Sequence, residues 1–373
     1  MTEYSPMKLI LILLTFTVIS NVLAADDQPF TLKGKWLVET NGQEMIHPQT
    51  SALKLWRGKL LSISDRSAVQ SQQKQLHIID SSTGMVAEKS LTIHLADNVK
   101  NSCFSEYLSG KPDFEALVVA PNNDRVFFVV TEDARPTVLS SSCQKRFDNT
   151  GSTDYPSLLV RLELTKNNVL LITHVRPIQF DSDFNIGNFP NDGIEGMAFG
   201  QNNTLYLGLE KDSQGSARIF SLPITTDFWQ LTDFIQLTDT QVSLPKFASG
   251  RHPINGMDYL PVKGHVGYLV AAARNDDQLW IIDLANKKPT KVISMKFLAP
   301  IGNNNEQCGH NDWEVIKHTS LEGIAVDNET IWMINDPWTE FYLDNVICES
   351  NRDKYQHLSP LLFSFPISKN WFE

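Results

Sequence analysis

Acidic residues recur at comparable places along the chain, beside short apolar runs that are separated by Asn, Asp, Gly and Pro. One set stands where an apolar run begins, namely Asp113, Glu115, Glu195, Asp258 and Glu322. A second set follows the next run along the chain, namely Asp65, Glu132, Glu210 and Asp336, with Arg66, Lys211 and Arg274 beside or in place of the acid. Carboxylates gathered in a narrow space need cations to neutralise them. Oxygen ligands favour a hard ion, so the pattern indicates a Ca²⁺ site.

The apolar runs themselves recur in five registers of up to four runs, which begin near Ala52, Glu115, Glu195, Met257 and Glu322. A repeat of this size is typical of propellers, in which the first strand of each blade lines a central channel. We therefore predict an all-β, single-domain β-propeller of four-stranded blades. Five blades are counted, and six stay open because the registers are unevenly spaced. The fifth register lacks its last run, and residues 33–40 would supply it, so that the N-terminal strand closes the ring.

In such a propeller both sets of acids meet at one mouth of the channel, and we assign them roles there. Glu195 and Glu322 are the predicted catalytic residues, because a carboxylate can orient or deprotonate a water. The predicted substrate-binding cations are Arg66, Lys211 and Arg274. The predicted metal ligands are Asp65, Glu115, Glu132, Glu210 and Asp336. The alternative is structural: an acid at a strand entrance accepts backbone N–H groups, and its recurrence in every register favours that role.

A second calcium candidate is the run from Asp181 to Asp192, whose alternating oxygen side chains resemble an EF-hand loop with Gly187 one position late. A solvated Asn/Asp loop is the alternative. Signatures of other reactions are missing from the sequence, including GxSxG, HExxH and a Gly-rich phosphate loop.

Residues 60–67, 112–133, 192–212 and 320–337 resemble the secreted phytase-like family named for "esterase-like activity of phytase", which is distantly similar to the calcium-dependent β-propeller phytases. Asp65 and Arg66 match the turn after a second strand, and Glu195 and Glu322 match the Glu-Gly strand starts. The resemblance implies a secreted propeller with esterase or phytase activity. The fourth register departs from the pattern, because it carries Gly256-Met257-Asp258 and Arg274.

The ends and the composition indicate the compartment. Lys8 and an apolar run from Leu9 to Ile19 predict a signal peptide over residues 1–24, followed by one propeller domain over residues 25–373. No later segment is apolar enough to span a membrane. We expect two disulfides in an oxidising compartment, and among three connectivities local pairing joins Cys103 to Cys143 and Cys308 to Cys348. With 32 basic against 43 acidic residues, the net charge of −11 argues against nucleic-acid binding.

These observations together predict a secreted or periplasmic, metal-dependent hydrolase of phosphate or related esters. Its partner is a small anionic ester bound at the acidic mouth, its cofactor is Ca²⁺, and we expect a monomer. A non-catalytic propeller that binds a ligand or a protein partner at the same mouth is the main alternative. A hydrolase of sugar lactones or other uncharged esters is the third.

Overall fold

The computed structural model describes residues 28–132, 140–147, 156–184, 186, 193–302, 308, 310 and 312–372. Strands predominate among these residues, and the α-helices are short, with four to six residues each: α1 (Asp97–Lys100), α2 (Ser105–Ser109), α3 (Ser141–Arg146) and α4 (Arg352–Gln356). The predicted signal peptide and most of the loop from Asp181 to Asp192 lie outside the described residues. In the described part, no helix has the length and apolar character needed to cross a membrane.

The strands of the described residues follow one another in antiparallel groups. The first group is β2 (Lys54–Trp56), β3 (Lys59–Ile63), β4 (Gln75–Ile79) and β5 (Leu91–Leu95). The second is β6 (Phe114–Ala120), β7 (Asn123–Thr131), β8 (Leu158–Leu164) and β9 (Leu170–Gln179). The third is β10 (Ile194–Phe199), β11 (Thr204–Leu209), β12 (Arg218–Pro223) and β14 (Thr238–Asp239).

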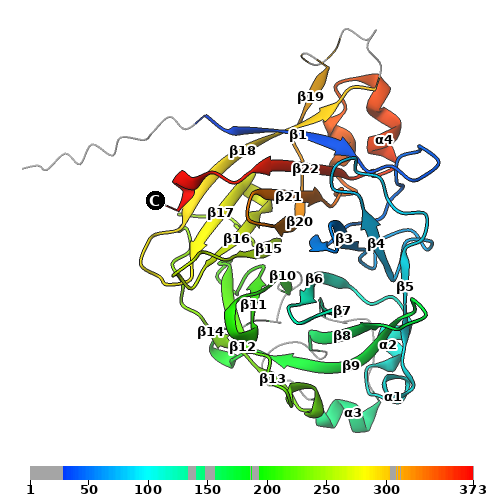
Figure 1. The fold of residues 1–373 in the computed structure, drawn as a ribbon, viewed down its shortest axis with the longest axis vertical. Helices are drawn as coiled ribbons and strands as arrows, with labels where there is room; N and C mark the ends of the chain where they lie inside the picture. The colour runs from blue at the N-terminus through cyan, green and yellow to red at the C-terminus, as the bar shows by residue number, and fades with distance from the viewer. Residues whose placement is uncertain are drawn as a thin grey trace, which may run out of the picture.

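Two more groups complete the ring (Figure 1). The fourth is β15 (Gly256–Leu260), β16 (Tyr268–Ala273), β17 (Gln278–Asp283) and β18 (Lys291–Pro300). The fifth is β20 (Leu321–Val326), β21 (Thr330–Asn335) and β22 (Leu361–Pro366). The innermost strands β2, β6, β10, β15 and β20 contact one another in a closed cycle and surround a common centre. Antiparallel groups arranged radially in this way define a β-propeller.

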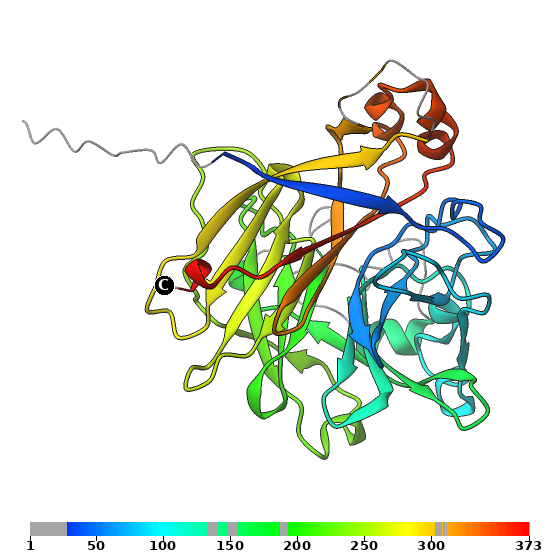
Figure 2. The same ribbon diagram turned by 45° about the horizontal axis from the view of Figure 1, so that its top comes forward.

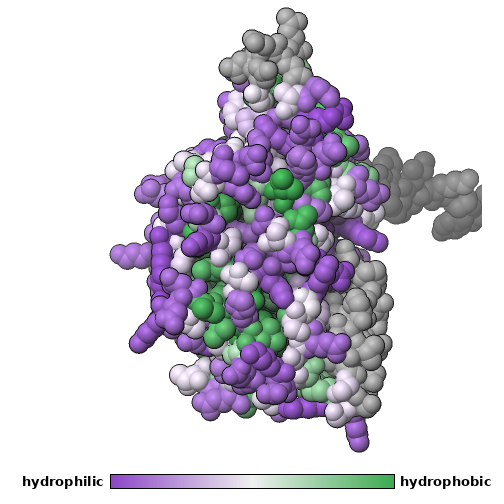
Figure 3. Space-filling view, turned by 90° about the vertical axis from the view of Figure 1, so that its right-hand side faces the viewer, coloured by the Kyte–Doolittle hydropathy of each residue, from purple (hydrophilic) through white to green (hydrophobic). Residues whose placement is uncertain are grey.

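Apolar side chains from neighbouring groups pack against each other and hold the ring together. Between the second and third groups, for example, Val118 and Phe128 belong to the same buried cluster as Met197 and Leu207. The outer side of the molecule that Figure 3 presents is mostly hydrophilic, with hydrophobic residues in small groups between polar ones. Inner strands such as β7, β16 and β20 are buried along most or all of their length, so both of their faces pack against neighbouring groups and the core lies between the groups.

The N-terminal strand β1 (Phe30–Trp36) connects the fourth group to the fifth (Figure 2). Its first half, Phe30–Lys33, pairs parallel with β18, and its second half, Gly34–Trp36, pairs antiparallel with β22. The predicted strand over residues 33–40 is therefore displaced toward the N-terminus. The outer part of the third group is divided, because β13 (Ile235–Gln236) pairs with β9 and only β14 pairs with β12.

Two disulfides, Cys103–Cys143 and Cys308–Cys348, confirm the local pairing expected from the sequence. The first ties the segment of α1 and α2 to α3, and the second ties the chain before β19 (Trp313–Ile316) to the segment before α4. Figure 1 shows β19 and α4 projecting beyond the ring of strands. The disulfides therefore brace insertions around the propeller and leave the innermost strands uncrossed.

Candidate functional site

Three glutamates on innermost strands meet at the centre of the ring. Glu115 in β6, Glu195 in β10 and Glu322 in β20 each stand where the pairing register shifts at a β-bulge. A bulge leaves one residue out of the ladder and redirects its side chain. All three side chains are buried, and one carboxylate oxygen from each lies within 4.8 Å of the other two. The bulges thus gather three acids that regular strands would send into the packed faces.

Two more acidic groups overlap this one. Asp65 and Asp113 lie with Glu115, and Glu132 and Glu210 lie with Glu195, again with oxygens within 4.8 Å of one another. Glu115 and Glu195 each belong to two of these sets of acids, so the three sets form one continuous acidic cluster. We call these residues, together with Asp336, the acidic mouth.

One repeated backbone contact positions the acids that follow the second strands. The N–H of each donates to the carbonyl oxygen of a residue that precedes the first strand of the same group. These contacts are Asp65 to Gln49 (3.0 Å), Glu132 to Asp113 (2.9 Å), Glu210 to Gly193 (2.9 Å) and Asp336 to Ser320 (2.8 Å). The contact uses backbone atoms alone, so it fixes where each acid stands without engaging its carboxylate.

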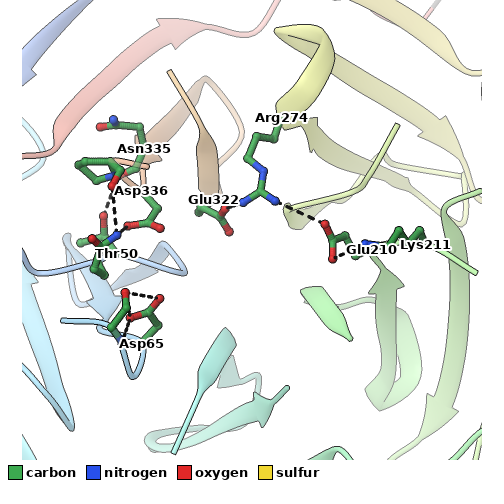
Figure 4. A network of polar contacts seen from close by, with 11 residues as sticks. Thr50, Asp65, Glu210, Lys211, Arg274, Glu322, Asn335 and Asp336 are labelled. Atoms are coloured by element: carbon green, nitrogen blue, oxygen red, sulfur yellow. Dashed lines mark hydrogen bonds and ion pairs between the residues drawn. The ribbon is translucent and has the colours of Figure 1, made fainter. Parts of the chain in front are cut away.

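The predicted substrate-binding cations contact these acids. Arg274 takes the place of the acid in the fourth group and projects between two carboxylates (Figure 4), donating to Glu322 and, at 3.4 Å, to Oε1 of Glu210. Arg66 Nε lies 2.9 Å from Oδ2 of Asp113, and Lys211 Nζ lies 3.8 Å from Oε2 of Glu210. The Arg66 side chain is the most exposed of the three, at 46% against 25% for Arg274 and 7% for Lys211.

Asp336 lies across the mouth, where it accepts a hydrogen bond from Nε2 of Gln49 (Figure 4). Within the described residues, two buried oxygens accept no hydrogen bond, Oε1 of Gln49 and Oε2 of Glu210, and the latter has only the 3.8 Å ion pair with Lys211. Buried oxygen atoms normally accept hydrogen bonds. These two oxygens can therefore accept a further partner, such as a cation.

Burial raises the pKa values of the acids at the mouth, and their mutual repulsion adds to the effect. The pKa of Asp65 rises to about 7, and those of Glu322 and Asp336 rise to about 8. The pKa values of Glu115 and Glu195 lie well above their usual range for the same reasons. Arg274 opposes the rise at Glu322. The cluster therefore requires protons or metal ions in addition to the cations that the chain supplies.

The fourth group differs from the sequence prediction, which placed Asp258 at the mouth. Asp258 instead pairs with the buried Lys54, whose Nζ lies 2.9 Å from Oδ1, and accepts the N–H of Val326. Gly256 pairs with Ala272 as Gly196 pairs with Gly208. The residue that corresponds to Glu195 is therefore Asn255.

Sequence reasoning missed Asn255, although a signal was present. Ile254-Asn255-Gly256-Met257 repeats Ile194-Glu195-Gly196-Met197 with one change. The sequence prediction aligned Asp258 with the glutamates of the other groups because it is an acid. The observed strand register instead aligns Asn255, which precedes Gly256, with Glu195, which precedes Gly196. In the first strand group, Ser51 takes the position that Glu195 has in the third. Thr50 forms an isolated antiparallel β-bridge with Ser64, and the Ser51 N–H donates to the carbonyl oxygen of Ile63.

No protein-family model and no curated protein matches the chain. The resemblance to the phytase-like family therefore stays a prediction. Among solved structures, the chain is similar to the Malassezia sympodialis allergen Mala s 1, with a TM-score of 0.46, 8% identity and coverage of 86% of this chain and 94% of that one. It is also similar to virginiamycin B lyase from Staphylococcus aureus, with a TM-score of 0.36, 12% identity and coverage of 90% of this chain and 100% of that one.

A GH62 hydrolase solved with xylotriose gives a TM-score of 0.42 and 10% identity, over 90% of this chain and 97% of that one. Likenesses this distant do not bear on activity or ligand. The function must therefore be argued from the acidic mouth itself.

Proposed function

We propose that this protein is a divalent-metal-dependent hydrolase of phosphate or related esters, and that the acidic mouth is its active site. The observation that carries the proposal is the continuous cluster of acids from several strand groups, whose carboxylates outnumber Arg66, Lys211 and Arg274. Like charges held this close need a further cation. Carboxylate oxygens are the ligands that Ca²⁺ prefers.

Each residue of the acidic mouth has a proposed role in the hydrolysis. A bound divalent ion would neutralise the ester and lower the pKa of an attacking water. Asp65, Glu115, Glu132, Glu210 and Asp336 are the proposed ligands. Glu195 or Glu322 would orient the water or take its proton. Arg66 is the cation best placed for the substrate oxyanion, because it is half exposed, whereas Arg274 and Lys211 mainly neutralise Glu210 and Glu322.

Several wider parts of the proposal accompany the activity. We take the strand groups as the blades of a five-bladed propeller whose last blade β1 completes. We propose a secreted or periplasmic monomer that acts on a small anionic ester, and the two disulfides support an oxidising compartment.

The experiment is phosphate release from phytate and from an aryl phosphate, with Ca²⁺ titrated into protein that a chelating resin has stripped. We expect release that depends on Ca²⁺ and that Glu195→Gln and Glu322→Gln each reduce at least 100-fold. Glu340→Gln, at an exposed position, is the control and should leave the rate unchanged. Turnover that persists in both folded variants would refute the catalytic assignment.

A ligand-binding propeller without turnover is the second candidate. The observation in its favour is that each of Arg66, Lys211 and Arg274 already contacts a carboxylate. It predicts stable binding of a ligand at the mouth with no product formed. Hydrolysis of uncharged esters that phosphate does not inhibit would instead favour the third reading, a lactone or carboxylic-ester hydrolase.

A further inference from the structure

Asn255 carries a buried amide that makes no hydrogen bond within the described part of the chain. Its exposed fraction is 0%, and neither Oδ1 nor Nδ2 has a hydrogen-bond partner there. Burying an amide without a partner is costly, so buried amides in folded proteins are almost always paired. A partner that the protein itself does not provide would explain why an amide stands at this position.

The backbone places Asn255 beside the glutamates at the centre. The Asn255 N–H donates to the carbonyl oxygen of Ala272 at 3.0 Å, directly before the pairing of β15 with β16 begins. A Cβ on Gly256 would lie 2.6 Å from the carbonyl oxygen of Glu322, and one on Gly196 would lie 2.8 Å from Cβ of Met257. Strand β15 therefore lies directly against both β10 and β20. Asn255 stands between Glu195 and Glu322 in the ring.

The space between the innermost strands is small. A cavity of about 10 Å³ there is lined by Glu195, Glu322 and Gly256 together with Lys54 and apolar residues. Asn255 and Glu115 border it only through their neighbours Gly256 and Ala116. That volume is close to the smallest that holds one water molecule. The glutamate oxygens lie within 4.8 Å of one another, so one divalent ion can contact all three at ordinary metal–oxygen distances.

The charge at this point also fits a divalent ion. Three ionised glutamates and the single Arg274 that contacts Glu322 leave a net charge of −2. A neutral amide oxygen adds a ligand without adding charge, which is how Asn serves in calcium sites.

We propose that Asn255, Glu115, Glu195 and Glu322 form a calcium site on the axis of the propeller, with Oδ1 of Asn255 as the neutral ligand. The four ligands come from four different strand groups, so the ion ties neighbouring innermost strands together. The inference shares Glu115, Glu195 and Glu322 with the proposed active site but goes beyond the proposed function, because it gives Glu195 and Glu322 a metal-binding role that stabilises the fold and requires no turnover.

The test compares Asn255→Leu with wild type by calorimetric Ca²⁺ titration and by thermal melting of stripped protein with and without Ca²⁺. Leucine has nearly the shape of asparagine but no polar atoms. We expect Asn255→Leu to weaken Ca²⁺ binding at least tenfold. Its melting temperature without metal should equal or exceed that of wild type, because an unpaired amide is removed. With Ca²⁺, the wild type should gain more than the variant.

Two further variants sharpen the test. Asn255→Asp should melt lower than wild type without metal and gain more from Ca²⁺, because it adds a fourth carboxylate to the site. Asn345→Leu is the matched control, since Asn345 is equally buried but accepts the N–H groups of Lys317 and His318. It should lose stability in both conditions and keep the Ca²⁺ response of the wild type.

The proposal is wrong if Asn255→Leu loses as much stability without metal as Asn345→Leu, if it keeps the full Ca²⁺ response, or if wild type binds no Ca²⁺. An equal response to Mg²⁺ would overturn the assignment to calcium. Ca²⁺ binding that depends on Asn255, in a protein that hydrolyses no ester, would refute the proposed function and leave the axial site standing. Calcium-dependent hydrolysis in the wild type, with Ca²⁺ binding unchanged in Asn255→Leu, would refute the axial site and support the proposed function.

Discussion

Raising the pH from 6.5 to 8.5 should destabilise the metal-free protein, because of the acids at the mouth. The pKa of Glu322 in the folded protein is about 8, against an ordinary 4.5, and those of Asp336 and Asp65 are also raised, to about 8 and about 7, chiefly by burial. The unfolded chain has released these protons by pH 6.5, whereas the folded chain still holds them. The folded state therefore binds more protons, so stability present at low pH is lost as the pH rises through the folded pKa values.

The loss of stability can be calculated for Glu322 alone. A tenfold change in proton affinity is worth about 1.4 kcal/mol, so for Glu322 alone the two pH units lower the free energy of unfolding by about 2 kcal/mol. Asp336 and Asp65 act in the same direction. The window starts at 6.5 because the fully buried His77, whose pKa is lowered to about 4, has the opposite effect when the unfolded chain takes up protons below that pH.

The assay is urea unfolding followed by circular dichroism, at half-unit steps of pH, in buffer stripped of metal by a chelating resin. Glu322→Gln should flatten the slope of stability against pH by about one proton, whereas Glu340→Gln, which removes an exposed carboxylate, should leave it unchanged. Saturating Ca²⁺ should abolish or reverse the fall, because a metal ion binds the deprotonated carboxylates. Metal-free stability that is flat or rising across the window, with a constant m-value, would refute this account of the mouth.

Three other perturbations test the positions of particular elements. Arg274→Met leaves Glu322 and Glu210 without their shared cation, so it should lower metal-free stability by about 3 kcal/mol and raise Ca²⁺ affinity; unchanged affinity by calorimetry would count against a metal at the mouth. Replacing Cys308 and Cys348 together by Ser opens a loop with a sequence separation of 40 and should cost about 4 kcal/mol in urea unfolding, and a loss near zero would contradict the bracing role. Deleting residues 25–36 removes β1 and exposes the edges of β18 and β22, so light scattering should show aggregation; a soluble, monomeric product with unchanged melting would show that β1 does not close the ring.

The first and second strands of each group were predictable because local sequence features indicate both the strand and the residue at which it ends. Runs such as EALVVA and TLYLGLE are apolar, are rich in β-forming residues and end in an acid or a turn. Local pairing was the expected one of three connectivities, because it joins each cysteine to its neighbour in the sequence, at a separation of 40. These features depend on residues close together in the chain.

The register of the fourth group and the course of β1 were less accessible. Asp258 is the acid of this strand, but the ring position belongs to Asn255, as the pairing of Gly256 with Ala272 shows and as the repeat of the Ile-x-Gly-Met sequence indicates. The three-residue shift between these two positions changes which side chain reaches the axis. The divided pairing of β1 depends likewise on β18 and β22, which lie far along the chain.

The sequence by itself determined that the protein is mostly β and that its acids recur with the strand repeat, whereas it left three disulfide connectivities open. These properties arise from periodicity and composition, which are local. Only the tertiary structure decided that bulges aim Glu115, Glu195 and Glu322 at one point, that Arg274 is shared by two acids, and that Asn255 is buried without a partner. The physical reason is that charge repulsion, burial and unsatisfied hydrogen bonding depend on distances between separate strands, and closure of the ring sets those distances.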